Sequence, residues 1–178
     1  RLEANADGNI HIDDKTSTEL LAHYENDWGH HDENDDGFLD EPMVQQFNQQ
    51  NRWQYRGTRY IFHGGLGLLS EQRDGGQDHH TAPDVHDPYV INVKTNRYEA
   101  YMKHAFIIDP EHGTNIAIMG NASLHQLDAQ YGKKDYNVDQ KNAYAQLMFE
   151  TNLTQQHSLS AGLSLNHDYL TRDEKETT

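Results

Sequence analysis

The chain has 178 residues and a net charge of −15, and only 34% of its residues are hydrophobic, with a mean hydropathy of −1.00. A helical membrane protein is excluded, because no stretch approaches the roughly 20 consecutive apolar residues that a spanning helix needs. Nucleic-acid binding is not expected either, because the 14 Lys and Arg residues are scattered rather than clustered. Without cysteine, neither a disulfide framework nor a thiolate metal site is available.

Extended segments with alternating apolar and polar side chains recur along the chain, and each predicts a strand with two unlike faces. Such long segments argue against disorder, which the composition alone would also suit. Their length exceeds that of typical soluble strands and matches the roughly 9 to 11 residues that a tilted strand needs to cross a bilayer. In chain order, strands are expected at 1–12, 15–26, 44–56, 59–73, 94–109, 114–129, 140–153 and 158–172.

Short turns and long polar segments alternate between these strands, as they do at the two ends of an outer-membrane barrel. Turn residues predict short connections near 13–15, 56–58, 109–113 and 154–157. The long segments 26–43, 74–93 and 131–139 are rich in Asp, Asn, Gly or His, and we place them outside the cell. The prediction is an all-β fold of about eight antiparallel transmembrane β-barrel strands joined as meander hairpins, with long outer loops.

Aromatic residues near the expected strand ends predict the two girdles of a membrane barrel, although Tyr and Phe favour any strand. These residues are Tyr24, Trp53, Tyr55, Tyr60, Phe62, Tyr98, Phe106 and Tyr169. His104 and His167 fall on the apolar face, which suits them only near an interface. Gly64, Gly65 and Gly67 lie inside a strand with no helix after it, so they predict a bend or close packing rather than a phosphate loop.

The outer segments also carry motifs in a fixed order. Residues 32–42 read DENDDGFLDEP, residues 51–55 read NRWQY, and the strand at 59–73 is followed by DGGQ. In order and spacing these motifs resemble the barrel of Bacteroidetes-type TonB-dependent outer-membrane receptors. The resemblance implies that 1–178 is a partial outer-membrane β-barrel domain, part of a barrel of about 22 strands. The plug domain and the TonB-engaging motif of that family are absent from the sequence.

What the resemblance implies is transport across the bacterial outer membrane. The chain would be a segment of a receptor that binds and imports a scarce nutrient complex, such as cobalamin, haem or a ferric siderophore. TonB would supply the energy through the missing plug, outer-membrane lipid would surround the barrel, and a surface lipoprotein is a further candidate partner over the loops.

No enzymatic role is expected, because the chain has no Cys nucleophile, no G-x-S-x-G elbow and no H-E-x-x-H helix. The alternative is a self-contained eight-stranded outer-membrane barrel with a structural or adhesive role. Such a small barrel could instead have an enzymatic role at its rim, with a site built from Ser123, His125, Ser164 and Asp168.

Segment 26–43 contains seven acidic residues and no Lys or Arg, and this repulsion favours a bound cation. The run from Asp32 to Asp40 places oxygen ligands at positions 1, 3, 5 and 9 of an EF-hand-like loop, with Gly37 at position 6. Position 12 is Met43 instead of Glu, so Asp40 or Glu41 would supply the missing carboxylate. A solvated acidic loop without a metal is the alternative. The predicted Ca²⁺ ligands are Asp32, Asn34, Asp36, the Phe38 carbonyl, Asp40 and Glu41.

Histidines occur as adjacent pairs in two different outer segments. Imidazole binds Zn²⁺, copper or haem iron, but neighbouring residues on an extended chain point apart. We therefore expect solvent-exposed loop histidines rather than a chelate formed by either pair. The candidate contacts for a transported ligand are Trp28, His30, His31, His79, His80, His86 and Tyr131.

Overall fold

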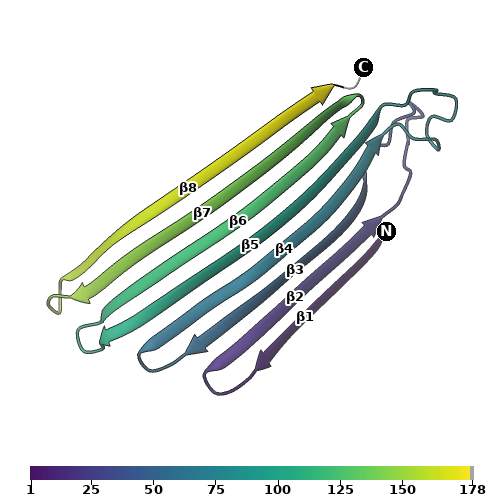
Figure 1. Cartoon of the computed structure of the whole chain (residues 1–178). Helices are drawn as coiled ribbons and strands as arrows, with labels where there is room; N and C mark the ends of the chain where they lie inside the picture. Colours follow the sequence, from purple (N-terminus) through teal and green to yellow (C-terminus); the bar gives the residue numbers. More distant parts are fainter. Residues whose placement is uncertain (177–178) are drawn as a thin grey trace.

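The computed structural model describes residues 1–176, which form one antiparallel sheet of eight strands in sequence order (Figure 1). The strands are β1 Leu2–His11, β2 Thr16–Asp27, β3 Met43–Arg56, β4 Tyr60–Gly76, β5 Val90–Asp109, β6 Thr114–Tyr131, β7 Lys134–Asn152 and β8 Ser158–Glu176. The all-β class, the eight strands and their antiparallel meander are confirmed. Within the same range no helix is long and apolar enough to cross a membrane.

Four short turns join the strands at one end of the sheet, at 12–15, 57–59, 110–113 and 153–157, where turns were predicted. Local side-chain chemistry explains these reversals. The Asp13 carboxylate accepts the backbone N–H groups of Lys15 and Thr16, both at 2.8 Å. Asp109 likewise accepts the N–H of Glu111 at 3.0 Å. Such Asx turns need only residues close in sequence, which is why the sequence predicts them.

At the opposite end, loops 28–42 and 77–89 are long, but the third connection is only residues 132–133. The prediction of a long loop at 131–139 is therefore wrong. Strands β6 and β7 stay paired up to the turn, with Tyr131 opposite Lys134, and Gly132 takes the positive φ of 59° that a tight hairpin turn needs.

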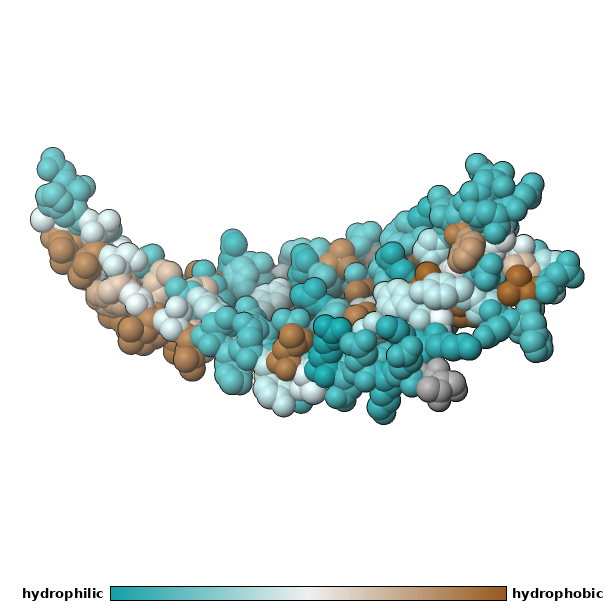
Figure 2. Space-filling view, turned by 90° about the horizontal axis from the view of Figure 1, so that it is seen from above, coloured by the Kyte–Doolittle hydropathy of each residue, from teal (hydrophilic) through white to brown (hydrophobic). Residues whose placement is uncertain are grey.

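The register sorts the side chains of the whole sheet onto two faces, because paired residues of neighbouring strands share a face. One face is apolar over the half of the sheet nearest the short turns, with Leu66, Met102, Ile118, Leu147 and Leu163 among its members. The sheet is curved, and apolar side chains gather on its convex side while hydrophilic ones line its concave side (Figure 2). These are called the convex and concave faces below.

All eight aromatic residues singled out in the sequence lie on the convex face. Near the short turns the rings of Tyr55 and Tyr60 lie 5.7 Å apart, and those of Tyr60 and Phe106 lie 5.2 Å apart. Phe106 and Tyr98, eight residues apart on β5, mark the two edges of the apolar band, which is about 27 Å long measured along the strand.

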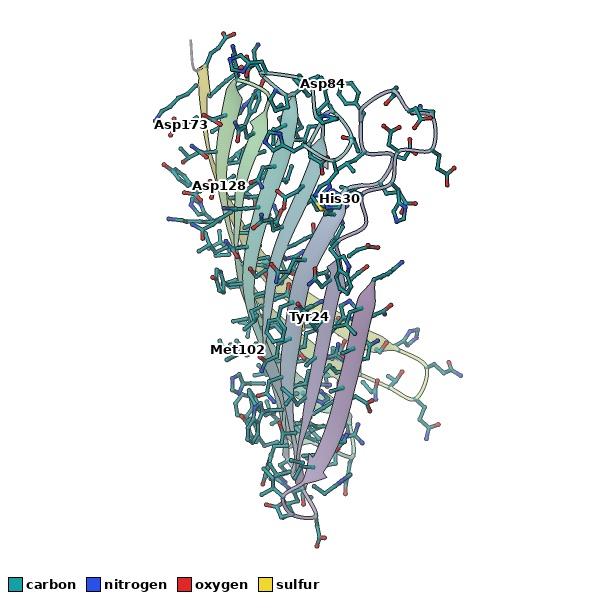
Figure 3. All side chains as sticks on the ribbon, turned by 90° about the vertical axis from the view of Figure 1, so that its right-hand side faces the viewer. Tyr24, His30, Asp84, Met102, Asp128 and Asp173 are labelled. Atoms are coloured by element: carbon teal, nitrogen blue, oxygen red, sulfur yellow. The ribbon has the colours of Figure 1, made fainter. Side chains whose placement is uncertain are left out.

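Beyond Tyr98, towards the long loops, the convex face becomes polar. Lys94 lies opposite Asp128 there. In Figure 3, Asp128 and Asp173 extend from the same side of the ribbon as Met102, which belongs to the apolar band. The alternation of β5, β6 and β7 reverses at this height, so that apolar side chains turn to the concave face. The concave apolar residues are Ile91, Val93, Leu127, Ala129, Tyr131, Tyr136 and Val138. This reversal explains why 131–139 reads as a loop in the sequence.

The glycines of β4 permit close packing, as predicted. A Cβ added at Gly64 would lie 2.5 Å from Cζ of Phe62, and one added at Gly65 would lie 2.7 Å from Cε1 of Tyr101. His104 lies within the aromatic row, where its Nδ1 hydrogen-bonds the Tyr60 hydroxyl at 2.7 Å. The hydrogen bond explains how a histidine is accommodated on the apolar face.

Both edges of the sheet are open. Strand β1 pairs only with β2 and β8 only with β7, and every residue of these two strands is exposed. A self-contained closed barrel requires a β1–β8 ladder, which residues 1–176 do not form. Leu163 and Leu165 are 76% and 70% exposed. An uncovered apolar face and two unpaired edges call for contacts with material outside this sheet.

Candidate functional site

The two long loops form one unit at the open end of the sheet. The Leu39 N–H donates to the Gly76 carbonyl at 2.8 Å, which ties loop 28–42 to the end of β4. Gly37, with φ of 85°, lies so close to the second loop that an added Cβ would be 3.5 Å from Cβ of Ala82. Ala82 is only 7% exposed as a result. The loops predicted to be outer binding surfaces thus pack against each other.

One carboxylate, that of Asp78, links the loops. It accepts the backbone N–H groups of Thr81 (2.8 Å) and His80 (2.9 Å) within its own loop. From the other loop, Nδ1 of His30 bonds to its second oxygen. The rings of His30 and His80 lie 4.2 Å apart, and Figure 3 places His30 near the base of the loops. Two predicted ligand contacts from different histidine pairs are therefore neighbours in space.

The hydrogen bonds control the ionisation of Asp78. Partial burial raises the pKa of this carboxyl group, but the Thr81 N–H, the His30 ring and the His80 N–H lower it more, to about 2. Asp78 therefore stays ionised and accepts hydrogen bonds at all but very acidic pH.

The acidic run closes on its own backbone. Oδ1 of Asp32 and Oδ1 of Asn34 each lie 3.2 Å from the Asp36 N–H, and Asp32 also accepts the Gly37 N–H at 2.9 Å. Oδ2 of Asp40 accepts the Glu33 N–H at 2.7 Å. Side chains at positions 1, 3 and 5 of the predicted Ca²⁺ loop therefore converge, and the sharp turn falls at Gly37.

The other predicted Ca²⁺ ligands, Phe38 and Glu41, do not join the cluster of Asp32, Asn34 and Asp36. Phe38 donates its backbone N–H to Asp36 at 2.9 Å, and its side chain is 40% exposed. Glu41 is exposed and makes no hydrogen bond with another residue in the part of the chain that the structure describes. Across residues 1–176, no group of three His, Asp or Glu side chains is already arranged to hold a metal ion.

Loop 77–89 is also fastened on its other side, to the hairpin turn between β6 and β7. Nζ of Lys133 pairs with Oδ2 of Asp87 at 2.9 Å, and the Gly132 N–H donates to the Val90 carbonyl at 2.8 Å. The ring of Tyr89 packs against Gly132, where an added Cβ would lie 2.6 Å from Cε2 of the ring. The three connections at this end are thus linked in one chain of contacts.

Tyr131 is at the end of β6 and not in a loop. Its ring meets the Tyr136 ring edge-on at 5.9 Å, and the Arg172 guanidinium lies 5.5 Å from the centre of the Tyr136 ring. Together these side chains form an aromatic and cationic patch on the concave face beside the loops. The exposed residues Trp28, His31, His79 and His86 extend the accessible surface of this end.

The concave face carries a hollow of 490 Å³ that the sequence did not predict, lined by Ser17, Gln50, Arg52, His63 and Tyr101 among others. Nη1 of Arg52 lies 3.5 Å from Oε2 of Glu19 and Nη2 donates to Gln50 at 2.8 Å. Gly67 is part of its lining and adds no side chain on this face. Its mixture of donors and acceptors suits a polar solute.

The alternative rim residues Ser123, His125, Ser164 and Asp168 share the concave face. Asp168 accepts hydrogen bonds from Asn142 (2.6 Å) and Asn166 (3.2 Å), and none joins it to His125 or Ser123. A nucleophile and base in contact would be needed for covalent catalysis.

Comparison with known proteins adds no relative: the sequence matches no protein-family model and no curated protein, and no solved structure matches the fold. The functional argument therefore depends on the residues of this chain and their arrangement.

Removing the Asp78 carboxylate, in Asp78→Asn, should separate the loops and lower the free energy of unfolding. Because the folded-state pKa is lowered, the contribution of Asp78 is fully present above pH 3.8 and is lost as the pH falls towards about 2. Urea unfolding of both proteins across this range measures it. Asp84→Asn is the matched control, since Asp84 is exposed in the same loop. A stability difference that stays constant down to pH 2 would contradict the assignment.

Proposed function

We propose that the chain is a segment of the barrel wall and outer loops of a TonB-dependent outer-membrane receptor that imports a scarce nutrient complex. The observation that carries this proposal is the segregation of the two faces of the sheet. An apolar convex band about 27 Å long along the strand covers roughly 20 Å of depth at the tilt of barrel strands, and its aromatic borders resemble those of the lipid-facing belt of a bacterial outer-membrane barrel. The polar concave face would line the lumen.

The open edges fit the same proposal. An antiparallel sheet of long strands with short turns at one end has the local architecture of a large barrel wall, and β1 and β8 offer unpaired edges to further strands. The barrel would contain a plug that engages TonB. The short turns would face the periplasm and the long loops the outside of the cell.

In this arrangement the nutrient complex meets the linked loops first and the concave face afterwards. Tyr131, Tyr136 and Arg172 offer stacking and charge beside the loops, and the polar hollow around Arg52 lies farther along the same face. Cobalamin, haem and ferric siderophores are large complexes that need both apolar contact and polar groups. A surface lipoprotein is the partner proposed for the outer side of the loops.

The test is binding of cobalamin, haem and a ferric siderophore to the protein in outer-membrane vesicles, measured by isothermal titration. One of the three should bind, and Trp28→Ala should weaken that binding, because Trp28 is 54% exposed at the loop end. Leu153→Ala is the matched control, with a side chain 63% exposed at the opposite end. Absence of binding by all three, or equal weakening by both variants, would refute the proposal.

The convex face supplies a second prediction. Leu147→Arg should destabilise the protein in lipid vesicles by about 2 kcal/mol or more, because a charge inside the hydrocarbon is costly. Gln146→Arg, one residue away on the concave face, should change stability by less than about 0.5 kcal/mol. Unfolding in urea measures both. Equal costs for the two arginines would show that the convex face does not meet lipid.

Calcium binding in loop 28–42 belongs to the same proposal. Asp32, Asn34 and Asp36 already converge, and the cation would relieve repulsion among the acids while Asp40 and Glu41 complete the oxygen set. Titration with Ca²⁺ should release heat, and Asp32→Asn should weaken the binding, whereas Asp84→Asn in the other loop should not. No heat with the wild-type protein would rule out the site.

A further inference from the structure

A hollow interrupts the apolar band of the convex face, where small side chains replace large ones. It consists of two adjoining depressions of 790 and 570 Å³, which share Leu66, Ala100 and Ala122. Gly120 and Ala145 continue its floor on β6 and β7. Large residues surround this floor, so the depression is open only outward from the convex face.

The dimensions of the hollow suit one hydrocarbon chain. Leu124 borders it towards the loops and Ile118 towards the short turns. These residues are six positions apart on β6, which is about 20 Å along the strand. The groove therefore runs along about three quarters of the apolar band, from the row of Tyr98 to the row of His104.

A cation without an ion partner lies at the loop-side rim. Lys141 lines the hollow and faces Leu124 and Tyr169 across the neighbouring strands, and it forms no ion pair within 4 Å in the described part of the chain. Asp139, two residues along the same face, accepts a hydrogen bond from Gln126 at 3.3 Å. Lys94 on the same face is nearer the long loops, outside the hollow, and lies opposite the Asp128 carboxylate in the strand register.

The height of Lys141 fits a lipid headgroup. Tyr98 and Tyr169 lie in the same row across the strands, and tyrosines mark the level at which hydrocarbon gives way to headgroups. An ammonium group at this level attracts the phosphate of an anionic lipid.

We propose that this hollow is a binding site for one anionic, phosphate-bearing lipid, with an acyl chain on the floor of Ala100, Gly120 and Ala122 and the phosphate at Lys141. The proposal rests on the placement of the convex face in the bilayer. The phosphate would lie at the loop-side edge of the apolar band, in the row of Tyr98 and Tyr169.

Native mass spectrometry of the protein released from mixed phosphatidylcholine and phosphatidylglycerol vesicles counts the lipids that stay bound. Phosphatidylglycerol should be retained about fivefold over phosphatidylcholine, the factor expected from one lysine at an anionic surface. Lys141→Gln should abolish this preference, and Lys94→Gln should leave it. Ala122→Phe should fill the hollow and reduce retention of both lipids, whereas Ser123→Phe on the concave face should not.

The outcomes separate this proposal from the proposed function. Insertion into vesicles with no preference for phosphatidylglycerol, or equal effects of Lys141→Gln and Lys94→Gln, overturns the lipid site alone. Failure of the wild-type protein to insert overturns both. The lysine variants change no packed residue, so their result stands even where Ala122→Phe does not fold.

Discussion

The two-residue period of the β-strand governs this molecule, because it assigns each side chain to one of two faces and the ladder hydrogen bonds hold that assignment across all eight strands. No second layer covers either face, and the only buried apolar side chains within residues 1–176 are three alanines. The sheet therefore has no core of its own. Its stability in the cell depends on what meets the convex face and the two open edges.

The reversal of polarity on β5 to β7 defines two levels along the sheet. From Tyr98 towards the short turns the convex face is apolar. From Tyr98 towards the long loops the same face carries charged residues, with Lys94 opposite Asp128. The apolar residues turn inward at that level, beside Tyr131 and Tyr136, and the linked loops begin just above. The same strands would thus carry a lipid-facing band nearer the short turns and a binding surface for a large ligand nearer the long loops.

Much of this arrangement is predictable from the sequence, since strand alternation and Asx turns depend on neighbouring residues. The strands, the four short turns and the shared face of the aromatic residues follow from such local patterns. The alternation changes phase at the Gly132 hairpin, which is why the sequence predicts a loop there, whereas the turn at Asp78 and Thr81 depends on residues three apart. The contact of His30 with Asp78 and the hollow at Arg52 depend on the pairing of distant segments, which no local pattern specifies.

The most direct test of the central claim uses the absence of cysteine from this chain. Single cysteines at positions 144 to 149 of β7 would carry a spin label in the protein in lipid vesicles, and accessibility to oxygen and to a water-soluble relaxant would be measured. Labels at 145, 147 and 149 should respond to oxygen dissolved in lipid, and labels at 144, 146 and 148 to the relaxant. Equal accessibility to water along the whole segment would contradict the account.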